Sequence, residues 1–236
     1  WWNGTEAFEP EVLRYFAPIA AKARGALDIG AYTGWYSVVA ATLNANTEVL
    51  AFEPHPEIAA SLQANLDLNS LNNVRVIRCA VAESEGEAEF YLGAAGLPSS
   101  SSLESEWEGY QTIIVQTRPV DDVVEAVELA HVDLVKIDIE GSEHRAIAGM
   151  EHTIRKHEPV IFFEVLHAHR KTFAETLGSL AQQGYLTYEC TPEMLILLDS
   201  SSSPLDALMA ATSTNFLAIK KESQFIPLLM PYINEL

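Results

Sequence analysis

The chain has few cysteines and no long apolar run. It contains two cysteines in 236 residues, Cys79 and Cys190, one within an expected strand and the other at the end of one. Cysteines this sparse indicate buried free thiols in a reducing compartment, with a disulfide between them as the alternative, so we expect a cytoplasmic protein. The longest apolar runs, such as residues 160–163, are far shorter than the roughly 20 residues that cross a bilayer. We therefore expect no membrane-spanning segment.

Basic residues are also scarce. The sequence has 14 Lys and Arg against 33 Asp and Glu, which gives a formal net charge of −19. A protein that binds nucleic acid must neutralise phosphates with clustered Lys and Arg, and no such cluster is present. We expect no nucleic-acid partner. The same charge repels anionic membranes, whereas a small neutral or cationic substrate meets no electrostatic barrier.

The length suits one domain with its own core. A chain of 236 residues with 48% hydrophobic content is typical of a single globular unit. We predict one domain over residues 1–236, with an N-terminal helical segment at 1–24, a core at 25–220 and a C-terminal tail at 221–236. The sequence begins at Trp1 with neither an initiator Met nor a signal pattern, and we interpret it as part of a longer protein.

Strand and helix patterns alternate along the chain. Short apolar runs predict strands, and longer stretches with 3.6-residue periodicity predict helices. This alternation implies an α/β fold of Rossmann-like type, with a mostly parallel central sheet and helices on both faces. The predicted strands cover residues 25–28, 49–53, 74–81, 132–138, 159–166, 186–189 and 216–220, and the predicted helices cover residues 35–44, 56–69, 143–156 and 170–183.

One stretch interrupts this alternation. Residues 87–92 and 112–116 have the pattern of two further strands, which predicts an inserted β-hairpin after the third main strand. The Gly- and Ser-rich residues 93–105 between them are either a loop that closes over a ligand or a plain connector. A second Ser-rich piece at 200–203 predicts a surface loop.

The first expected strand leads into a glycine turn. Asp28 is followed by Gly30 and Gly34, then by a helix and a second strand that ends at Glu53. The two glycines let the backbone approach a ligand closely, and the helix directs its first N–H groups at the same place. Glu53 can accept hydrogen bonds from both hydroxyls of a ribose. The pattern is typical of a site for an adenine nucleoside.

The turn lacks the third glycine of a Gly-x-Gly-x-x-Gly pyrophosphate cradle. A carboxylate at Asp28 repels a pyrophosphate but suits an ammonium or sulfonium group. S-Adenosylmethionine carries both cations and no phosphate, and the turn resembles the first motif of class I methyltransferases, with Asp28 facing the methionine end. A nucleotide-dependent dehydrogenase is the alternative, which the missing glycine and Asp28 disfavour.

Further residues are predicted to complete this cofactor site. Thr33 can hydrogen-bond the cofactor's carboxylate, and Pro54 fixes the turn beneath the ribose. Ala80 and Val81 are placed to line the adenine pocket, although apolar residues there are equally expected of a core. Tyr36 is predicted to be a packing residue. The predicted cofactor-binding residues are Asp28, Gly30, Ala31, Thr33, Gly34, Glu53, Pro54, Ala80, Val81 and Asp138.

Two later segments narrow the match to one family. Residues 132–143 read Val-Asp-Leu-Val-Lys-Ile-Asp-Ile-Glu-Gly-Ser-Glu, and residues 159–165 read Pro-Val-Ile-Phe-Phe-Glu-Val. With the Asp28 and Glu53 motifs and the Ser-Ser-Ser-Leu of residues 100–103, they resemble the FkbM family of methyltransferases over roughly residues 8–220. The resemblance implies methyl transfer from S-adenosylmethionine to a hydroxyl of a small molecule, a polyketide or a sugar. A scaffold protein that keeps the cofactor pocket without turnover is a further alternative.

Acids at the ends of the fourth and fifth main strands are the candidate catalytic groups. Asp138 ends one strand and Glu164 lies near the end of the next. If these strands are neighbours, the carboxylates approach one another, and crowding raises one pKa and makes that group a general base. Glu140 and Glu143 either join this site or cap the helix that follows.

Three histidines and a lysine lie in the same segments. His144, His167 and His169 follow these strand ends, and His167 is the favoured imidazole base. Lys136 is either a buried ammonium paired with an acid or a cation that steers an anionic acceptor. The acids could instead hold Mg²⁺, but a catechol-type site would supply two Asp and one Asn, so we assign no metal ligands.

Overall fold

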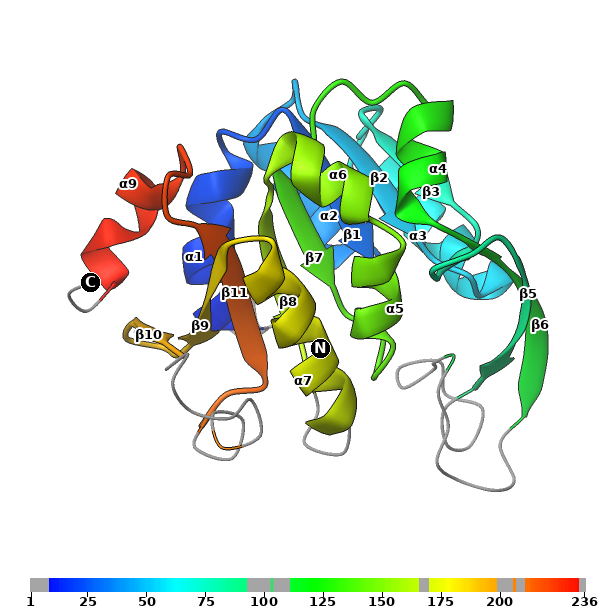
Figure 1. Cartoon of the computed structure of the whole chain (residues 1–236). Coiled ribbons are helices and arrows are strands. Elements are labelled where there is room, and N and C mark those ends of the chain that lie inside the picture. The colour runs from blue at the N-terminus through cyan, green and yellow to red at the C-terminus, as the bar shows by residue number, and fades with distance from the viewer. Residues whose placement is uncertain are drawn as a thin grey trace.

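A computed structural model describes residues 9–92, 103, 111–165, 170–198, 206 and 211–233. The predicted alternation of strands and helices is present (Figure 1). The short apolar runs form strands because both faces of the sheet are covered. β1 (Gly25–Ile29) and β7 (Leu134–Ile137) are buried at every position, as expected at the centre of a parallel sheet.

The other strands and helices include predicted elements and several that were not predicted. The remaining strands are β2 (Glu48–Phe52), β3 (Val74–Ile77), β4 (Ala80–Val81), β5 (Gly86–Tyr91), β6 (Thr112–Arg118), β8 (Val160–Glu164), β9 (Tyr185–Cys190), β10 (Leu195–Leu197) and β11 (Asn215–Lys220). The helices are α1 (Pro10–Ala20), α2 (Trp35–Leu43), α3 (Pro56–Leu68), α4 (Val120–Ala126), α5 (Glu143–Ala148), α6 (Glu151–His157), α7 (Arg170–Gln182) and α9 (Ile226–Leu229), with a 3₁₀ turn, η4, at Met230–Tyr232.

The main sheet is mostly parallel, as predicted. Within the described residues its order is β10-β9-β11-β8-β7-β1-β2-β3. β1 pairs in parallel with β2 and β7, and β7 pairs in parallel with β8. β11 runs antiparallel to both β8 and β9. The carboxyl ends of β1, β2, β7 and β8 therefore share one edge of the sheet, where ligands of open α/β sheets bind.

Helices cover both faces of this sheet (Figure 1). On one face, side chains of α4, α5, α6 and α7 form a common core with alternate residues of the central strands. On the other face, α1, α2 and α9 pack against the intervening residues of the same strands. Alternation along each strand explains why the same short runs serve two cores.

The inserted hairpin is confirmed, with one correction. β5 and β6 pair antiparallel and extend away from the main sheet at the right of Figure 1. The single strand predicted for residues 74–81 is wrong, because the chain leaves the main sheet after Ile77. β3 stays beside β2, and β4 joins the hairpin sheet by pairing with β6. Cys79 thus lies between two strands rather than within one.

The single helix predicted for residues 143–156 is also divided. α5 and α6 are separated at Gly149 and Met150, where the chain passes very close to a neighbouring loop. A Cβ at Gly149 would lie 2.3 Å from the carbonyl oxygen of Ala82. The sequence prediction missed α4, β10 and α9, which are seven, three and four residues long and carry little periodicity.

The structure tests several smaller predictions from the sequence. Cys79 and Cys190 are buried free thiols, as expected. α1 confirms a helix within the N-terminal segment. No helix in the described ranges combines the length and apolar character needed to cross a bilayer. The Ser-rich loop at 200–203, and the loop at 93–105 apart from Leu103, lie outside the described residues, and the one-domain boundaries stay a prediction.

Candidate active site

The glycine turn after β1 packs closely against the chain that follows β7, whereas its predicted approach to a ligand stays a prediction. Gly30 has φ +82°, a conformation that side chains disfavour, and a Cβ there would lie 1.9 Å from the carbonyl oxygen of Asp138. Gly34 has φ +92° and directly precedes α2. A Cβ at this position would lie 3.2 Å from the side chain of Leu62 on α3. The turn is held by the carbonyl of Phe52, which accepts hydrogen bonds from the amides of Gly30 and Ala31. Only glycine fits position 30 without moving the chain.

Glu53 lies directly after β2 and is fixed by the backbone. Its Oε2 accepts a hydrogen bond from the amide of Tyr32 at 3.0 Å, and its Oε1 accepts one from the amide of His55 at 2.8 Å. Burial raises the pKa of Glu53 to about 7, although these two bonds oppose the rise. A carboxylate held this way keeps further lone pairs for two vicinal hydroxyls.

Asp28 is buried beside the turn, as the sequence predicts, and it also supports the following helix. Its Oδ2 accepts hydrogen bonds from the amide and the hydroxyl of Ser37, at 2.9 and 2.6 Å. This oxygen therefore satisfies a donor in the first turn of α2. Burial raises the pKa of Asp28 to about 6, opposed by the bonds from Ser37 and by the charge of Lys136. Its predicted position beside a cationic ligand stays a prediction.

The other predicted cofactor residues surround this turn or follow the third strand. Ala31 is buried within the turn, and the carbonyl of Thr33 accepts a hydrogen bond from Asn65. Ala80 and Val81 form β4 and are buried against β6 and the core, so their packing accounts for their apolar character. Their contact with a cofactor, like that of Thr33 and Pro54, stays a prediction.

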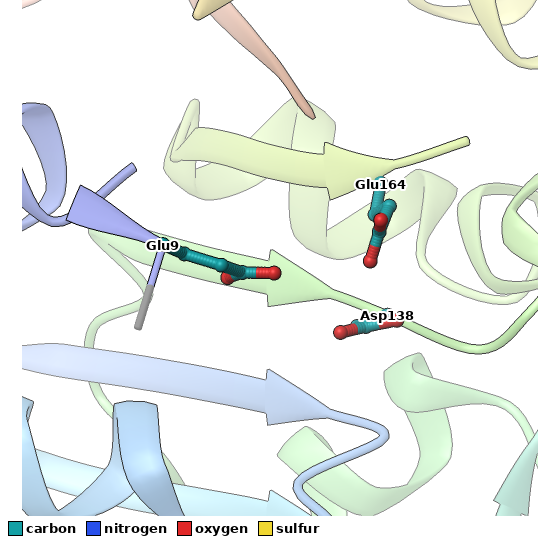
Figure 2. A group of neighbouring side chains, drawn as sticks. All are labelled: Glu9, Asp138 and Glu164. Carbon is teal, nitrogen blue, oxygen red and sulfur yellow. The ribbon is translucent and has the colours of Figure 1, made fainter. Parts of the chain in front are cut away.

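Three carboxylates converge at the carboxyl ends of β7 and β8. Asp138 follows β7 and Glu164 ends β8, and because these strands are parallel neighbours the two side chains meet as predicted. Glu9, just before α1, joins them. One carboxylate oxygen from each lies within 4.8 Å of the other two. Figure 2 shows the three side chains converging from their separate segments. This acid trio (Glu9, Asp138 and Glu164) is half-buried.

The sequence prediction missed Glu9. It lies outside the regular elements, has φ +43°, and is brought to the strand ends by the path of the chain into α1. Its Oε2 accepts a hydrogen bond from the hydroxyl of Tyr36 on α2. Tyr36 is buried, as expected of a packing residue, and its hydroxyl additionally fixes this acid. No local sequence signal marks a residue that reaches the site from so far along the chain.

Lys136 supplies the positive charge beneath the acid trio. Its side chain is 1% exposed, and its Nζ lies 3.6 Å from Oδ2 of Asp138. The ammonium also lies over the ring of Tyr36, 5.2 Å from its centroid. The expectation of a buried ammonium paired with an acid is confirmed. The alternative, a cation that steers an acceptor, does not suit a side chain that solvent barely reaches.

Glu164 has the raised pKa expected of a general base. Burial is the main cause, the charge of Asp138 adds to it, and the pKa reaches about 7. The ammonium of Lys136 and a 3.0 Å hydrogen bond from the hydroxyl of Thr214 oppose the rise. The predicted repulsion between the two carboxylates is therefore present, but it raises the pKa of Glu164 less than burial does.

The structure describes both neighbouring acids but only one of the three candidate histidines. Glu143 is buried at the start of α5, and its Oε1 accepts a hydrogen bond from the amide of Gly141 at 3.0 Å, which favours the capping interpretation. Burial and the charges of Asp138 and Glu164 raise the pKa of Glu140 to about 7. His144 lies on α5. His167 and His169 lie outside the described residues.

The domain comparison decides the family. Residues 28–187, which span every motif from the glycine turn to β8, match the family model described as the methyltransferase FkbM domain. The chain belongs to the FkbM methyltransferase family. The match contains Asp28, Glu53, Asp138 and Glu164, whereas Glu9 precedes it.

Two curated relatives are named as methyltransferases. The chain is 27% identical over 144 residues to NoeI, a 2-O-methyltransferase of Sinorhizobium fredii, covering 55% of this chain and 58% of NoeI. It is 25% identical over 183 residues to AglP, a hexuronic acid methyltransferase of Haloferax volcanii, covering 78% of this chain and 72% of AglP. The alignment thus spans little more than half of NoeI.

Solved structures show the same fold. An FkbM methyltransferase from Methylobacillus flagellatus superposes with a TM-score of 0.53 at 20% identity, over 83% of this chain and 43% of that one. An O-methyltransferase from Bacillus cereus in complex with SAH gives a TM-score of 0.53 at 14% identity, over 92% of this chain and 83% of that one. The FkbM domain described here therefore has the class I methyltransferase fold.

The raised pKa values predict a pH-dependent stability for this FkbM domain. Burial, as the largest cause, raises the pKa of Asp28 to about 6 and that of Glu53, Glu143 and Glu164 to about 7. The folded protein therefore binds more protons than the unfolded chain between about pH 4.5 and 7, and its free energy of unfolding falls as pH rises. The Tm should fall with the free energy of unfolding over this range. Thermal unfolding followed by circular dichroism should give a lower Tm at pH 8 than at pH 5.5, and a Tm that stays level or rises would contradict these burial effects.

Proposed function

We propose that this FkbM domain is an S-adenosylmethionine-dependent methyltransferase that methylates a hydroxyl of a small-molecule, polyketide or sugar acceptor. One observation carries the proposal: the glycine turn with Glu53 and the Asp138–Glu164 pair lie at one edge of a class I methyltransferase sheet. The name of AglP supports a sugar acid as the acceptor class, and the name of NoeI supports an oxygen as the acceptor atom.

The residues around the turn fit the proposed cofactor chemically. The lack of a side chain at Gly30 lets the turn pack directly against the carbonyl of Asp138, and α2 begins directly after Gly34. Glu53 would bind the ribose hydroxyls, and the carboxylate of Asp28 would lie on the cationic methionine side. Asp138, Thr33 and Pro54 are proposed to complete this site, with Ala80 and Val81 beside the adenine. When bound, S-adenosylmethionine supplies an electrophilic methyl group.

The proposed chemistry is an in-line displacement in which positioning does most of the work. The bound cofactor would supply the methyl group to the acceptor oxygen and leave as S-adenosylhomocysteine, and a carboxylate of this site would take up the hydroxyl proton. Glu164 is the proposed base, because its pKa of about 7 lies near neutral pH. Asp138, between Glu164 and Lys136, would orient the hydroxyl, and His167 is the alternative base.

A divalent metal is not needed for this scheme. The spacing of the acid trio would suit a shared cation, but the chain already places the ammonium of Lys136 3.6 Å from Asp138. Adding a chelator to the turnover assay tests this point. A metal-dependent activity would be lost, whereas the proposed scheme predicts that turnover is unchanged.

Substitution of the cofactor acids tests the proposal. Asp28→Asn and Glu53→Ala should each weaken binding of S-adenosylmethionine at least about tenfold, because each removes charge-assisted hydrogen bonds of about 1.5–3 kcal/mol. Asn at position 28 keeps an oxygen for Ser37, so the change reports on charge rather than on the start of α2. Calorimetric titration gives both affinities.

Glu48→Ala is the matched control for Glu53→Ala. Glu48 is the first residue of β2, at the opposite end of the strand from Glu53, and it is exposed. Its substitution should leave the affinity unchanged. Equal affinities for the wild type, Asp28→Asn and Glu53→Ala would remove the basis of the cofactor site.

A further inference from the structure

Lys136 is a full charge in the middle of a sheet. Its side chain is 1% exposed, and the neighbouring positions of β7 are apolar and buried. Removing an ammonium from water costs several kcal/mol unless partners compensate it. The strand could accommodate an aliphatic residue at this position, so the charge needs a reason beyond packing.

The position of Lys136 connects the two halves of the site. In the sheet it lies opposite Asp28 of β1 and opposite Phe162 of β8. Residues opposite one another in parallel strands point to the same face, and so do residues two apart along a strand. Asp28, Lys136, Asp138 and Glu164 therefore form a row of charges across three neighbouring strands, on the face covered by α1 and α2.

Acids face this ammonium from four segments of the chain. Asp138 on its own strand, Glu9 before α1, Glu164 on β8 and Asp28 on β1 all raise the pKa of Lys136, in that order, against the lowering effect of burial. Glu140 and Cys190 also interact with its charge, and Tyr36 covers it from α2. The net shift is upward, so Lys136 remains protonated and is not the base itself.

One fixed cation thus serves several carboxylates that would otherwise repel one another. The acid trio brings three carboxylates within 4.8 Å, and two like charges at such spacing resist ionising together. We propose that Lys136 is a positioning residue for methyl transfer, whose ammonium is the shared counter-ion that keeps Asp138 and Glu164 side by side and lets Glu164 ionise. Its importance for the reaction rests on the proposed function, whereas its effect on Glu164 can be measured without an acceptor.

Titration of Glu164 in Lys136→Met tests the proposal. The side-chain carboxyl carbon of Glu164 is followed by ¹³C NMR across pH 4–10 and assigned by the loss of its signal in Glu164→Gln. Loss of the ammonium should raise the pKa of Glu164 by at least about one unit, which is a tenfold change in its proton affinity. Lys136→Arg, which keeps the charge, should restore most of the wild-type pKa. A Glu164 that titrates equally in the wild type and in Lys136→Met would overturn the proposal.

A second pair of variants keeps the test decisive if Lys136→Met does not fold. Glu9→Gln removes one carboxylate of the trio, so Lys136→Met combined with Glu9→Gln carries less unbalanced charge. The pKa of Glu164 in this double variant is compared with that in Glu9→Gln alone, and the same upward shift is expected. No shift between these two proteins would contradict the role of Lys136.

Binding of S-adenosylhomocysteine to the same proteins separates this inference from the proposed function. A wild type that does not bind S-adenosylhomocysteine would refute the proposed function whatever the titration shows. Intact binding together with an unmoved Glu164 would refute only the role of Lys136. When an acceptor is in hand, the acidic limb of the kcat–pH profile should move upward in Lys136→Met, a change that a purely structural role would not produce.

Discussion

Glu164→Gln is expected to lower turnover at least about a hundredfold while leaving the affinity for S-adenosylmethionine within about threefold. General-base catalysis by a positioned carboxylate contributes about 10²–10⁴ to a rate. Gln keeps the size of the side chain and can still accept the hydrogen bond from Thr214, but it cannot take up the proton. Single-turnover kinetics with a sugar acceptor, alongside calorimetry with S-adenosylmethionine, separates the two effects.

Two further variants sharpen this result. Glu222→Gln changes an exposed glutamate outside the strands and should leave turnover unchanged. Asp138→Asn should also lose turnover, because Asp138 joins Glu164 to Lys136. Full turnover in both Glu164→Gln and Asp138→Asn would show that the carboxylate pair is not the base and would leave His167 as the candidate.

Gly30→Ala is expected to lose cofactor binding and much of the protein's stability. Position 30 has φ +82°, and its new Cβ would lie 1.9 Å from the carbonyl oxygen of Asp138, a backbone atom that cannot rotate away. The strain and the displaced chain should together cost about 2–4 kcal/mol, which lowers the Tm by about 5 °C or more. Because the turn and Asp138 move apart, binding of S-adenosylhomocysteine should also weaken by at least about a hundredfold.

Gly184→Ala is the matched control for this change. Gly184 has φ +81°, almost the same conformation, but a Cβ there meets nothing within 4 Å. Alanine at position 184 therefore has the energetic cost of a positive φ without a steric clash. Gly184 lies after α7, away from the glycine turn. Thermal unfolding and calorimetry on both proteins isolate the steric term. Equal losses in the two variants would mean that the contact between Gly30 and Asp138 is unimportant.

The parts of this site that the sequence predicts are those written into short, regular patterns. Asp28 and Glu53 are recognisable because each lies at or just past the carboxyl end of an apolar strand beside a glycine turn. Asp138 and Glu164 are recognisable for the same reason, and their meeting required only that β7 and β8 be neighbours. Fold class follows from the alternation of strands and helices.

The parts that the sequence does not predict depend on contacts between distant segments. Glu9 reaches the site because α1 packs on the sheet beside α2. Thr214 reaches Glu164 because β11 inserts antiparallel beside β8. The break after Ile77 follows from β4 finding its partner in β6, 37 positions further along between Ala80 and Thr117. Strand pairing between distant segments can therefore divide an apolar run that looks like a single strand in the sequence.

The pairing of Lys136 with Asp138 shows both what the sequence predicts and what it does not predict. The sequence allows either a buried ammonium or a steering cation, and only the burial of the side chain decides between them. That the same ammonium also faces Glu9, Glu164 and Asp28 depends on three other elements. The electrostatic character of the site is therefore a property of the assembled sheet rather than of any one motif.

Calorimetric titration of the purified chain with S-adenosylmethionine, S-adenosylhomocysteine and NAD tests the central claim most directly. The FkbM assignment and the geometry at Gly30, Asp28 and Glu53 predict micromolar binding of the first two and none of NAD, with no dependence on Mg²⁺. Binding of NAD in their place would contradict the account in favour of a dehydrogenase, and binding of none of the three would contradict the cofactor site itself.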